Sequence, residues 1–403
     1  MLNSLLLNET CKFKLKPSKE HRAILEDLFK AYTEMVKICL DNAMCFNITS
    51  RQKLHNALYR DLRSRYSEYP SHYIYTAITC ALAIFRSYRR RKKGSVSPPN
   101  IRNLNLNIRS ILLDDTHLFW FYWGSLRLST HRGHITIPFK VHEHAKKFIG
   151  WQVKGSRLVK DENNNFHLHV SFRNTVEEGR VDGILGIDIN EKSIDLAIVK
   201  LNKVKFIKID IAEAKYIRDR YFRKRRSIQS KSKSKGKGKT SGETKDTLLA
   251  KYSGRERRRV NEILHKASKL IAKIVAEENV KPVMENLKDI RERIQYGSRM
   301  NRRLHTIPFR KVQSYISYKS IEKGFEPEYV SAKNTSRRCP ICGKLSKPNG
   351  HLFKCGECGF QADRHLTAAW NIATRLSMWG ALPLPPKATE AFKAEVERIV
   401  IKN

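Results

Sequence analysis

Apolar residues in the first quarter of the chain recur with the spacing of α-helices. Those between residues 25 and 39 return every three or four positions, which places them on one face of a helix. They are Leu25, Leu28, Phe29, Tyr32, Met35, Val36 and Cys39. Further helices are predicted over residues 51–64 and before the basic stretch 86–93, and Pro98 and Pro99 end the helical region. We therefore predict a helical segment over residues 17–99.

The period of the pattern changes to two between about residues 101 and 173. Ile135, Ile137 and Phe139 alternate with polar residues, and the run from Phe166 to Phe172 alternates in the same way after a turn of three asparagines. This alternation is typical of strands that bury one face. Together with a short strand over residues 11–15, it predicts an antiparallel β-barrel or sandwich formed by residues 1–16 and 100–178.

Three strand-like runs follow, over residues 184–189, 194–199 and 204–209, and their short polar connections predict a β-meander. A strongly amphipathic helix from Val260 to Val275 then leads to a buried strand over residues 282–285. Three meander strands, a helix and a further strand are similar to the core of an RNase H-like α/β domain. We assign residues 179–335 to this domain and predict an α/β multidomain protein.

The charge of the chain indicates a polyanionic partner. Lysine and arginine number 79 against 39 acidic residues, a formal net charge of +40. Self-repulsion of this size destabilises a compact protein unless a polyanion neutralises it, so nucleic acid is the expected partner. No apolar run is long enough to span a bilayer, and no signal-peptide pattern follows Met1. We therefore expect no membrane association and a reducing, cytoplasmic location near the nucleoid.

A basic segment over residues 212–258 lies inside the predicted α/β domain. It holds the run Arg223, Lys224, Arg225 and Arg226, and between residues 231 and 239 lysine alternates with serine or glycine. No carboxylate occurs between Asp219 and Glu243. A segment of this composition is not expected to fold alone, and we expect it to contact phosphate groups. The alternative is a passive solvated linker.

Four cysteines near the end of the chain have the spacing of a metal site. They are Cys339, Cys342, Cys355 and Cys358, two CxxC pairs, and glycine follows the second cysteine of each pair. Four thiolates on two tight knuckles suit a tetrahedral, structural Zn²⁺ ion. The alternatives are coincidence or disulfide bonds. We predict a zinc-binding module over residues 336–360.

Three carboxylates are candidate ligands for a hydrated divalent cation. Asp188 ends the first meander strand, Glu285 ends the strand after the amphipathic helix, and Asp363 follows the last cysteine. Converging carboxylates suit Mg²⁺ or Mn²⁺, which can activate water for phosphodiester hydrolysis. Each residue also has a structural explanation: a turn for Asp188, and an N-cap on the helix after residue 363 for Asp363.

The ordered combination of these motifs resembles the TnpB family, transposon-encoded RNA-guided endonucleases related to type V CRISPR effectors. The resemblance depends on Gly186 to Asn190, the helix with Arg259 and His265, Val283 to Leu287, the cysteine pairs, and the closing motif from Asp363 to Ile372. It implies a wedge-like β-barrel that carries the helical segment as a recognition domain. It also implies a RuvC-type nuclease domain with the zinc-ribbon-like module inserted in it, closed by a final helix and tail over residues 361–403.

The resemblance further implies the partners and the site residues. The partners would be a guide RNA from the transposon end and double-stranded target DNA, which the protein would cut next to a short DNA motif. Asp188, Glu285 and Asp363 would be catalytic and hold Mg²⁺ or Mn²⁺. Nucleic-acid contacts are expected from Arg223, Lys224, Arg225, Arg226, Arg257, Arg259, His265 and Lys266.

One departure from the family pattern leaves two functions open. The family's closing motif begins Asp-Arg-Asp, and its third catalytic acid is normally the second aspartate, where this chain has His365. Asp363 could reach the metal ions from two residues upstream, or His365 could itself be a ligand, although imidazole suits Mg²⁺ poorly. Otherwise the protein binds guide-matched DNA without cutting it, as a repressor. We predict a nuclease, because Asp188 and Glu285 are both present.

Two other classes of protein share some of these features. The first class is a zinc-containing DNA-binding protein without catalytic activity. In such a protein the order of the three carboxylates along the chain would be a coincidence. A transposase that joins DNA ends would share the carboxylates but not a cysteine module between the second and third of them. The tail after Pro386 suggests a short amphipathic helix and carries no chemistry that we can identify.

Overall fold

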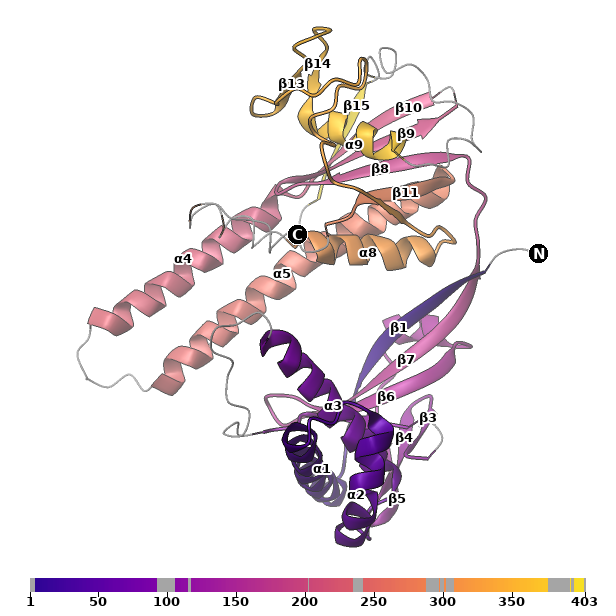
Figure 1. Cartoon of the computed structure of the whole chain (residues 1–403), viewed down its shortest axis with the longest axis vertical. Coiled ribbons are helices and arrows are strands. Elements are labelled where there is room, and N and C mark those ends of the chain that lie inside the picture. Colours follow the sequence, from indigo (N-terminus) through magenta and orange to yellow (C-terminus); the bar gives the residue numbers. More distant parts are fainter. Residues whose placement is uncertain are drawn as a thin grey trace. The chain divides into compact units, whose positions relative to one another are not determined.

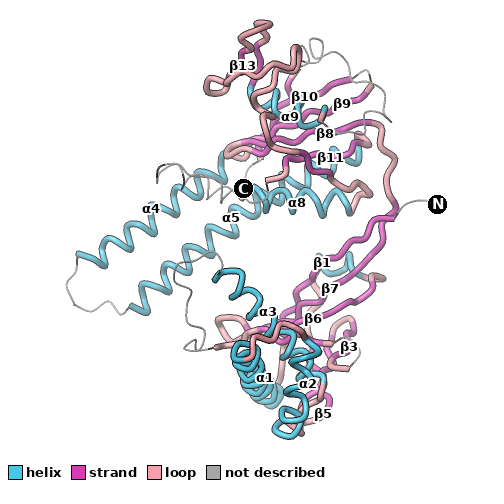
Figure 2. Tube along the Cα trace, in the orientation of Figure 1, coloured by secondary structure: helices cyan, strands magenta, loops and turns pink. Residues whose placement is uncertain are grey.

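The computed structural model describes residues 4–92, 106–114, 117–201, 203–234, 242–287, 297, 301, 308–375, 392 and 395–401. The chain divides into two compact units (Figures 1 and 2). The N-terminal unit is Asn8–Asn174, and the C-terminal unit is Met1–Leu7 with Thr175–Asn403. In the described part of the chain, no helix is both long and apolar enough to cross a bilayer.

Three helices form the first half of the N-terminal unit: α1 (Lys19–Cys45), α2 (Arg51–Arg65) and α3 (His72–Lys92). The first two begin at serines. Ser18 accepts a hydrogen bond from the backbone N–H of His21, and Ser50 accepts one from that of Lys53. Such N-caps satisfy N–H groups that have no partner within the helix. The apolar face predicted for the first helix is buried, which confirms the helical periodicity.

The rest of the N-terminal unit consists of strands and one short 3₁₀ helix, η2 (Glu143–Phe148). The strands are β1 (Ser4–Lys14), β2 (Ser110–Leu113), β3 (Phe119–Tyr122), β4 (Ser125–Thr130), β5 (Gly133–Pro138), β6 (Gln152–Lys160) and β7 (Phe166–Glu177). They form a four-stranded sheet in the order β1-β7-β6-β2 and a three-stranded sheet in the order β3-β4-β5. Along β7 every second residue from Phe166 to Phe172 is buried, as the period of two predicts.

A six-stranded mixed sheet forms the centre of the C-terminal unit, in the order β12-β11-β8-β9-β10-β15. The strands are β8 (Gly183–Ile189), β9 (Ser193–Lys200), β10 (Lys203–Asp210), β11 (Val280–Glu285), β12 (Glu328–Val330) and β15 (Val396–Val400). β8, β9 and β10 form the predicted antiparallel meander. β11 pairs in parallel with both β8 and β12. The predicted meander and the predicted buried strand are therefore both present.

Helices cover both faces of this sheet (Figure 1). α4 (Ala212–Ser234), α5 (Gly242–Glu277) and α8 (Phe309–Ile321) share a hydrophobic core with side chains of β8 such as Leu185 and Ile187. α9 (Arg364–Thr374) packs on the other face, with Ile184 and Val283. Because successive side chains of a strand point to opposite faces, Asp188 and Glu285 lie on the face that α9 covers.

Gly186 allows α9 to lie directly against β8. A Cβ atom at this position would lie 2.0 Å from the carbonyl oxygen of Ala369 and 2.7 Å from the backbone nitrogen of Ala373. Both contacts are with backbone, which cannot move without shifting the helix. The glycine two residues before Asp188 therefore sets the distance between this strand and the helix that carries His365.

Two expectations for local structure were wrong. Residues 223–234 of the basic segment belong to α4, which packs along α5 (Figure 1). The apolar positions Ile217 and Tyr221 hold α4 against the core, which the abundance of lysine and arginine obscures. Residues 235–241 lie outside the described residues. In the tail, residues 396–400 form β15, a parallel edge strand beside β10, where the sequence suggested an amphipathic helix. Residues 376–391, 393 and 394 of the tail lie outside the described residues.

Candidate functional site

The ends of three neighbouring strands bring three carboxylates to one edge of the sheet. Asp188 on β8 pairs directly with Asp195 on β9. On the other side of β8, Ile187 pairs with Met284, so Glu285 follows at the level of Asp188. The structure therefore brings together Asp188 and Glu285, which are the two acids predicted from strand ends, and adds Asp195.

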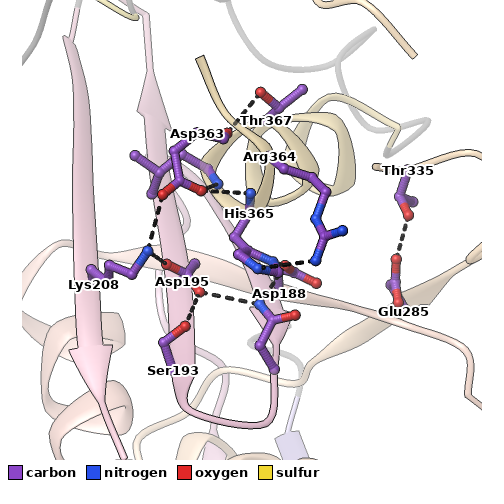
Figure 3. Close-up of polar contacts among 12 residues, drawn as sticks. Asp188, Ser193, Asp195, Lys208, Glu285, Thr335, Asp363, Arg364, His365 and Thr367 are labelled. Atoms are coloured by element: carbon purple, nitrogen blue, oxygen red, sulfur yellow. Dashed lines mark hydrogen bonds and ion pairs between the residues drawn. The ribbon is translucent and has the colours of Figure 1, made fainter. Parts of the chain in front are cut away.

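His365, in the first turn of α9, completes this cluster (Figure 3). Its Nδ1 atom lies 3.2 Å from Oδ2 of Asp188. One ligand atom each from Asp188, Asp195 and His365 lies within 4.8 Å of the others, and all three residues are buried. The spacing is compatible with a bound cation.

Asn190 in the β8–β9 turn and Ser193 at the start of β9 hold the aspartates in place. Nδ2 of Asn190 donates hydrogen bonds to Oδ2 of Asp188 at 2.7 Å and to Oδ2 of Asp195 at 3.1 Å. Oγ of Ser193 donates to Oδ2 of Asp195 at 2.6 Å. Asn190 thus bridges the two carboxylates and fixes their separation.

Lys208 on β10 is the cation of this cluster. Its Nζ lies 3.4 Å from Oδ1 of Asp195 and 3.0 Å from Oδ2 of Asp363. Burial raises the pKa of Asp195, although the Ser193 hydrogen bond and Lys208 act in the opposite direction. Burial acts to lower the pKa of Lys208, but the two carboxylates outweigh it and the pKa is raised. Lys208 is therefore held as a cation between them.

Asp363 is placed differently from the other predicted acids. It is the N-cap of α9, and its Oδ1 accepts hydrogen bonds from the backbone N–H groups of His365 at 2.7 Å and Leu366 at 3.4 Å. Burial acts to raise its pKa, but the hydrogen bonds from Lys208 and the His365 N–H outweigh it and lower the pKa. The structure thus places Asp363 against Lys208 and gives His365 the position that faces Asp188 (Figure 3).

Glu285 is a buried acid next to another acid. Oγ1 of Thr335 donates a hydrogen bond to its Oε1. Burial, followed by the negative charge of Asp188, raises the pKa of Glu285 to about 7. Two carboxylates that repel each other in a buried site are stabilised by a cation between them, so the arrangement fits a hydrated divalent metal ion.

Asn371 connects α9 to the segment that leads into the cysteine module. Its buried Nδ2 donates hydrogen bonds to the carbonyl oxygens of Thr335 at 2.7 Å and Arg338 at 2.8 Å. Thr335 is the residue that donates to Glu285. The asparagine of the closing motif therefore positions the partner of Glu285.

The four predicted cysteines form one cluster. Sγ of Cys339 lies 3.5 Å from that of Cys358, Sγ of Cys342 lies 3.5 Å from that of Cys355, and all four sulfurs lie within 4.8 Å of one another. A tetrahedral ion with Zn–S bonds of about 2.3 Å requires sulfurs about 3.8 Å apart. No disulfide joins these cysteines, so the geometry is compatible with zinc.

Each pair of cysteines lies on a tight turn with the same backbone geometry. Gly343 and Gly359, which follow the second cysteine of each pair, have φ of +72° and +73°. The N–H of Cys339 donates to the carbonyl of Lys344, and that of Cys355 donates to the carbonyl of Phe360, both at 2.8 Å. The glycines are therefore required by left-handed backbone, as the sequence pattern indicates. Figure 2 shows that this module is mostly loop.

A large basic cavity opens beside the carboxylate cluster. Its volume is about 1000 Å³, and His365 and Lys208 both line it. The other cations in its wall are Lys192, Lys215, Arg364 and Arg398. Arg398 comes from β15, so the tail contributes to this wall. Two acids, Glu191 and Asp210, also line the cavity, but the cations outnumber them. A cavity with this net charge suits a polyanion such as a nucleic-acid strand.

The residues predicted to bind nucleic acid lie on α4 and α5. Arg223, Lys224 and Arg226 are exposed, whereas Arg225 pairs with Glu256. Arg257 is exposed and Arg259 is half-buried. Lys266 pairs with Glu262 at 3.2 Å, and the ring of His265 stacks on Tyr315 with 3.9 Å between centroids. These residues lie on two helices that pack together, and Arg225, His265 and Lys266 also have structural partners.

The sequence analysis missed Asp195 and Lys208. Asp195 is the second residue of the strand-like run 194–199. The register of the hairpin identifies it, because residues 188 and 195 are equally far from the centre of the turn between β8 and β9. Lys208 follows from the next hairpin, where it pairs with Asp195. A charged pair that lies opposite across two buried strands was therefore a detectable signal.

A third group of potential ligands lies in the N-terminal unit. Nδ1 of His72 lies 3.0 Å from Oδ2 of Asp114, and Nδ1 of His117 lies 3.5 Å from its Oδ1. The two imidazole rings stack with 3.7 Å between centroids. Stacked rings cannot both direct Nδ1 in their ring planes at one ion, so we assign no metal to this group.

Comparison with known proteins identifies the class of protein. Residues 309–372 match the family described as "Cas12f1-like, TNB domain", and residues 28–127 match an "Uncharacterized protein MJ0013 family". The TnpB-like protein MJ0751 of Methanocaldococcus jannaschii is 34% identical over 278 residues, which are 67% of this chain and 98% of that protein. The chain belongs to the TnpB-like family, as the motifs predicted.

More distant relatives agree with this assignment. The TnpB-like protein aq_aa05 of Aquifex aeolicus is 24% identical over 58% of this chain and 81% of its own length. The CRISPR-associated endodeoxyribonuclease Cas12f1 of Sulfoacidibacillus thermotolerans is 33% identical over 27% of this chain and 25% of its own. A solved Cas12f1–sgRNA–target DNA complex superposes with a TM-score of 0.52 at 16% identity, covering 91% of this chain and 99% of that one. At that identity the superposition supports the fold alone: a mixed α/β multidomain fold similar to that of Cas12 effectors.

Proposed function

We propose that this protein is an RNA-guided DNA endonuclease of the TnpB type. It would hydrolyse phosphodiester bonds of DNA at a site formed by Asp188 and Glu285. The partners would be a guide RNA and double-stranded DNA that matches it, by analogy with the Cas12f1–sgRNA–target DNA complex. A single observation carries the proposal: Asp188 and Glu285, which are 97 positions apart, lie at the same level on neighbouring strands, and His365, which contacts Asp188, lines a basic cavity. Such a site can place a hydrated cation next to a bound polynucleotide.

The topology of the sheet supports an RNase H-like, RuvC-type domain. An antiparallel meander of β8, β9 and β10 is followed by α5 and by β11, which returns in parallel beside β8. In this arrangement the end of the first strand and the end of the fourth strand are neighbours. A carboxylate at each end would then be available to a metal ion bound between the two strands.

When bound, Mg²⁺ or Mn²⁺ would supply an activated water and stabilise the leaving oxygen. Asp188 and Glu285 would hold it, with Asn190 and Thr335 orienting their carboxylates. His365 is the third group at the site, and Asp363 would position it by capping α9. In this proposal Asp363 is therefore not the catalytic acid that the sequence predicted. It orients the helix that carries His365.

We propose zinc as the ion of the four-cysteine cluster. The N–H of Cys358 lowers the pKa of Cys355 to about 6, whereas burial raises the pKa of Cys339 to about 12. A cation that binds all four sulfurs would keep both as thiolates. The module would then be a structural element next to β14 (Gln361–Asp363), which leads directly into α9.

One observation favours a second function, guided DNA binding without cleavage. His365 stands where a third carboxylate is expected, and Lys208 neutralises both Asp195 and Asp363. Fewer free carboxylates would weaken the binding of Mg²⁺. The experiment that separates the two functions is to incubate the protein with its copurifying RNA, matched duplex DNA and Mg²⁺ or Mn²⁺. Cleavage that disappears in Asp188→Ala supports the nuclease, and retained binding without any cleavage supports the alternative.

A further inference from the structure

A smaller cavity, of about 260 Å³, lies between α4, α5 and the start of α8. Four cations line it: Arg218 and Arg225 from α4, Arg257 from α5 and Lys311 from α8. The only carboxylate among its described lining residues is that of Glu256. It is separate from the cavity beside His365, with which it shares no described lining residue.

The pairing inside this cavity leaves three of the cations without an acid. Glu256 makes an ion pair with Arg225. Among the residues that the structure describes, no carboxylate lies within ion-pair distance of Arg218, Arg257 or Lys311. Glu256 attracts Arg218 only at longer range. The cavity therefore holds four cations and one described carboxylate, and that carboxylate is paired with Arg225.

The environment of these cations indicates that the cavity suits an anion. Burial lowers the pKa of Arg218, against the attraction of nearby acids. Burial, and then the charges of Arg257 and Arg218, lower the pKa of Lys311. Like charges that are partly desolvated next to one another raise the free energy of the folded protein, and a bound anion would remove that cost.

The volume of this cavity and the hydrogen-bond donors that line it indicate which class of anion it suits. Guanidinium groups pair with phosphate through two parallel hydrogen bonds, and lysine adds a point charge. A volume of about 260 Å³ is below the range of typical small-molecule pockets, but it suits one phosphate with part of its sugar. Exposed Arg223, Lys224 and Arg226 continue the positive surface along α4, which suits neighbouring phosphates of a polymer.

We propose that Arg218, Arg257 and Lys311 bind one backbone phosphate of a nucleic-acid strand in this cavity, with Glu256 limiting the affinity by occupying Arg225. This inference deepens the proposed function, since it depends on nucleic acid being the partner. It adds Arg218 and Lys311, which the sequence analysis did not identify. The strand is either RNA or DNA, and the two share the phosphodiester that the cavity would hold.

The first test neutralises the cavity with the double variant Arg218→Gln/Lys311→Gln. The full-length, zinc-loaded protein is stripped of nucleic acid and titrated with a fluorescein-labelled 20-nucleotide RNA, the DNA of the same sequence, and its duplex, at several salt concentrations. The slope of log K against log salt should fall by about one, the value for one lost phosphate contact. The matched control Lys269→Gln/Lys273→Gln removes two exposed charges of α5 and should leave the slope close to that of the wild type.

The second test uses Glu256→Gln, which should tighten binding about twofold to fivefold because it releases Arg225 and removes the only acid among the described lining residues. Misfolding cannot produce tighter binding, so this variant keeps the inference falsifiable. An effect with RNA alone assigns the cavity to the guide, and an effect with DNA alone assigns it to the target. Equal slopes in the double variant and its control, or no tightening in Glu256→Gln, would overturn the inference. Neither result depends on cleavage, so failure of the nuclease proposal would be recognised separately.

Discussion

The imidazole Nδ1 of His365 lies 3.2 Å from the carboxylate Oδ2 of Asp188, although the two residues are 177 positions apart in the chain. The contact joins the first meander strand to the first turn of α9. It exists because Gly186 lets the helix lie on the strand and because Asp363 caps the helix immediately before His365. A histidine therefore occupies the place where the family pattern has its third acid.

The first prediction concerns the metal preference of this site. Imidazole binds Mg²⁺ poorly and accepts transition metals more readily. We expect His365→Asp to raise the rate of guided cleavage in Mg²⁺ by about tenfold or more, with a smaller gain in Mn²⁺ or Co²⁺. Cleavage rates in each metal, with the protein and RNA held constant, measure the effect. A variant with an unchanged or lower Mg²⁺ rate would mean that His365 is no substitute for a missing carboxylate.

The second prediction concerns Asp363. Asp363→Asn keeps an N-capping side chain but removes the charge, so α9 should remain in place. We expect the midpoint of thermal unfolding to fall by a few degrees, through loss of the Lys208 ion pair, and guided cleavage to change by less than about tenfold. Cleavage assays and melting curves on the same preparation are the measurement. A loss of about a hundredfold or more with normal melting would instead restore Asp363 as a catalytic acid.

The third prediction concerns the packing of α9. A side chain at Gly186 would meet the backbone of Ala369 and Ala373, so Gly186→Val should destabilise the C-terminal unit by about 3 kcal/mol or more. Chemical denaturation measures this loss. Gly155→Ala is the control, since a Cβ at Gly155 would meet no atom within 4 Å. Equal stability of the two variants would show that α9 does not lie on β8 as described.

The fourth prediction concerns zinc. Cys342→Ser should lower the zinc content of the purified protein to well below one ion per chain and should increase proteolysis within residues 336–360, because ligand loss couples to unfolding. Metal analysis and limited proteolysis measure the two effects. The control is Cys45→Ser, an exposed cysteine outside the cluster. Full zinc content in Cys342→Ser would remove this cysteine from the ligand set.

The fifth prediction concerns pH. Burial, followed by Lys12 and other cations, lowers the pKa of His169 to about 4 in the folded protein. Between about pH 6.5 and pH 4 the unfolded chain therefore binds a proton that the folded chain does not, so the N-terminal unit loses stability as the pH falls through this range. His169→Gln should reduce that loss by about 1–2 kcal/mol at pH 5 and change little at pH 8. His134→Gln, at an exposed histidine, is the control, and pH-dependent denaturation is the measurement.

Periodicity predicted the elements that bury one face. The helix through Leu25 and Cys39, the strand from Phe166 to Phe172 and the meander are present because burial of apolar side chains dictates them locally. The basic part of α4 was missed because its charge hides the few apolar contacts, at Ile217 and Tyr221, that anchor it. β15 was missed because edge pairing with β10 depends on a partner far away in sequence.

Part of the candidate site, like part of the fold, could be predicted from the sequence. The cysteines and the pair Asp188 and Glu285 follow from spacing and from strand ends. Whether Asp363 or His365 faces Asp188 depends on where α9 begins and on the direction of its first turn, which the sequence does not specify. Lys208 and Asp195 required the register of two hairpins.

Cleavage of guide-matched DNA is the most direct test of the central claim. The protein bound to its RNA should cut a matched duplex in Mg²⁺ or Mn²⁺, leave a mismatched duplex intact, and lose cutting but not binding in Asp188→Ala. Wild-type protein that binds the matched duplex and leaves it uncut in both metals, or Asp188→Ala that cuts as well as the wild type, would contradict the account.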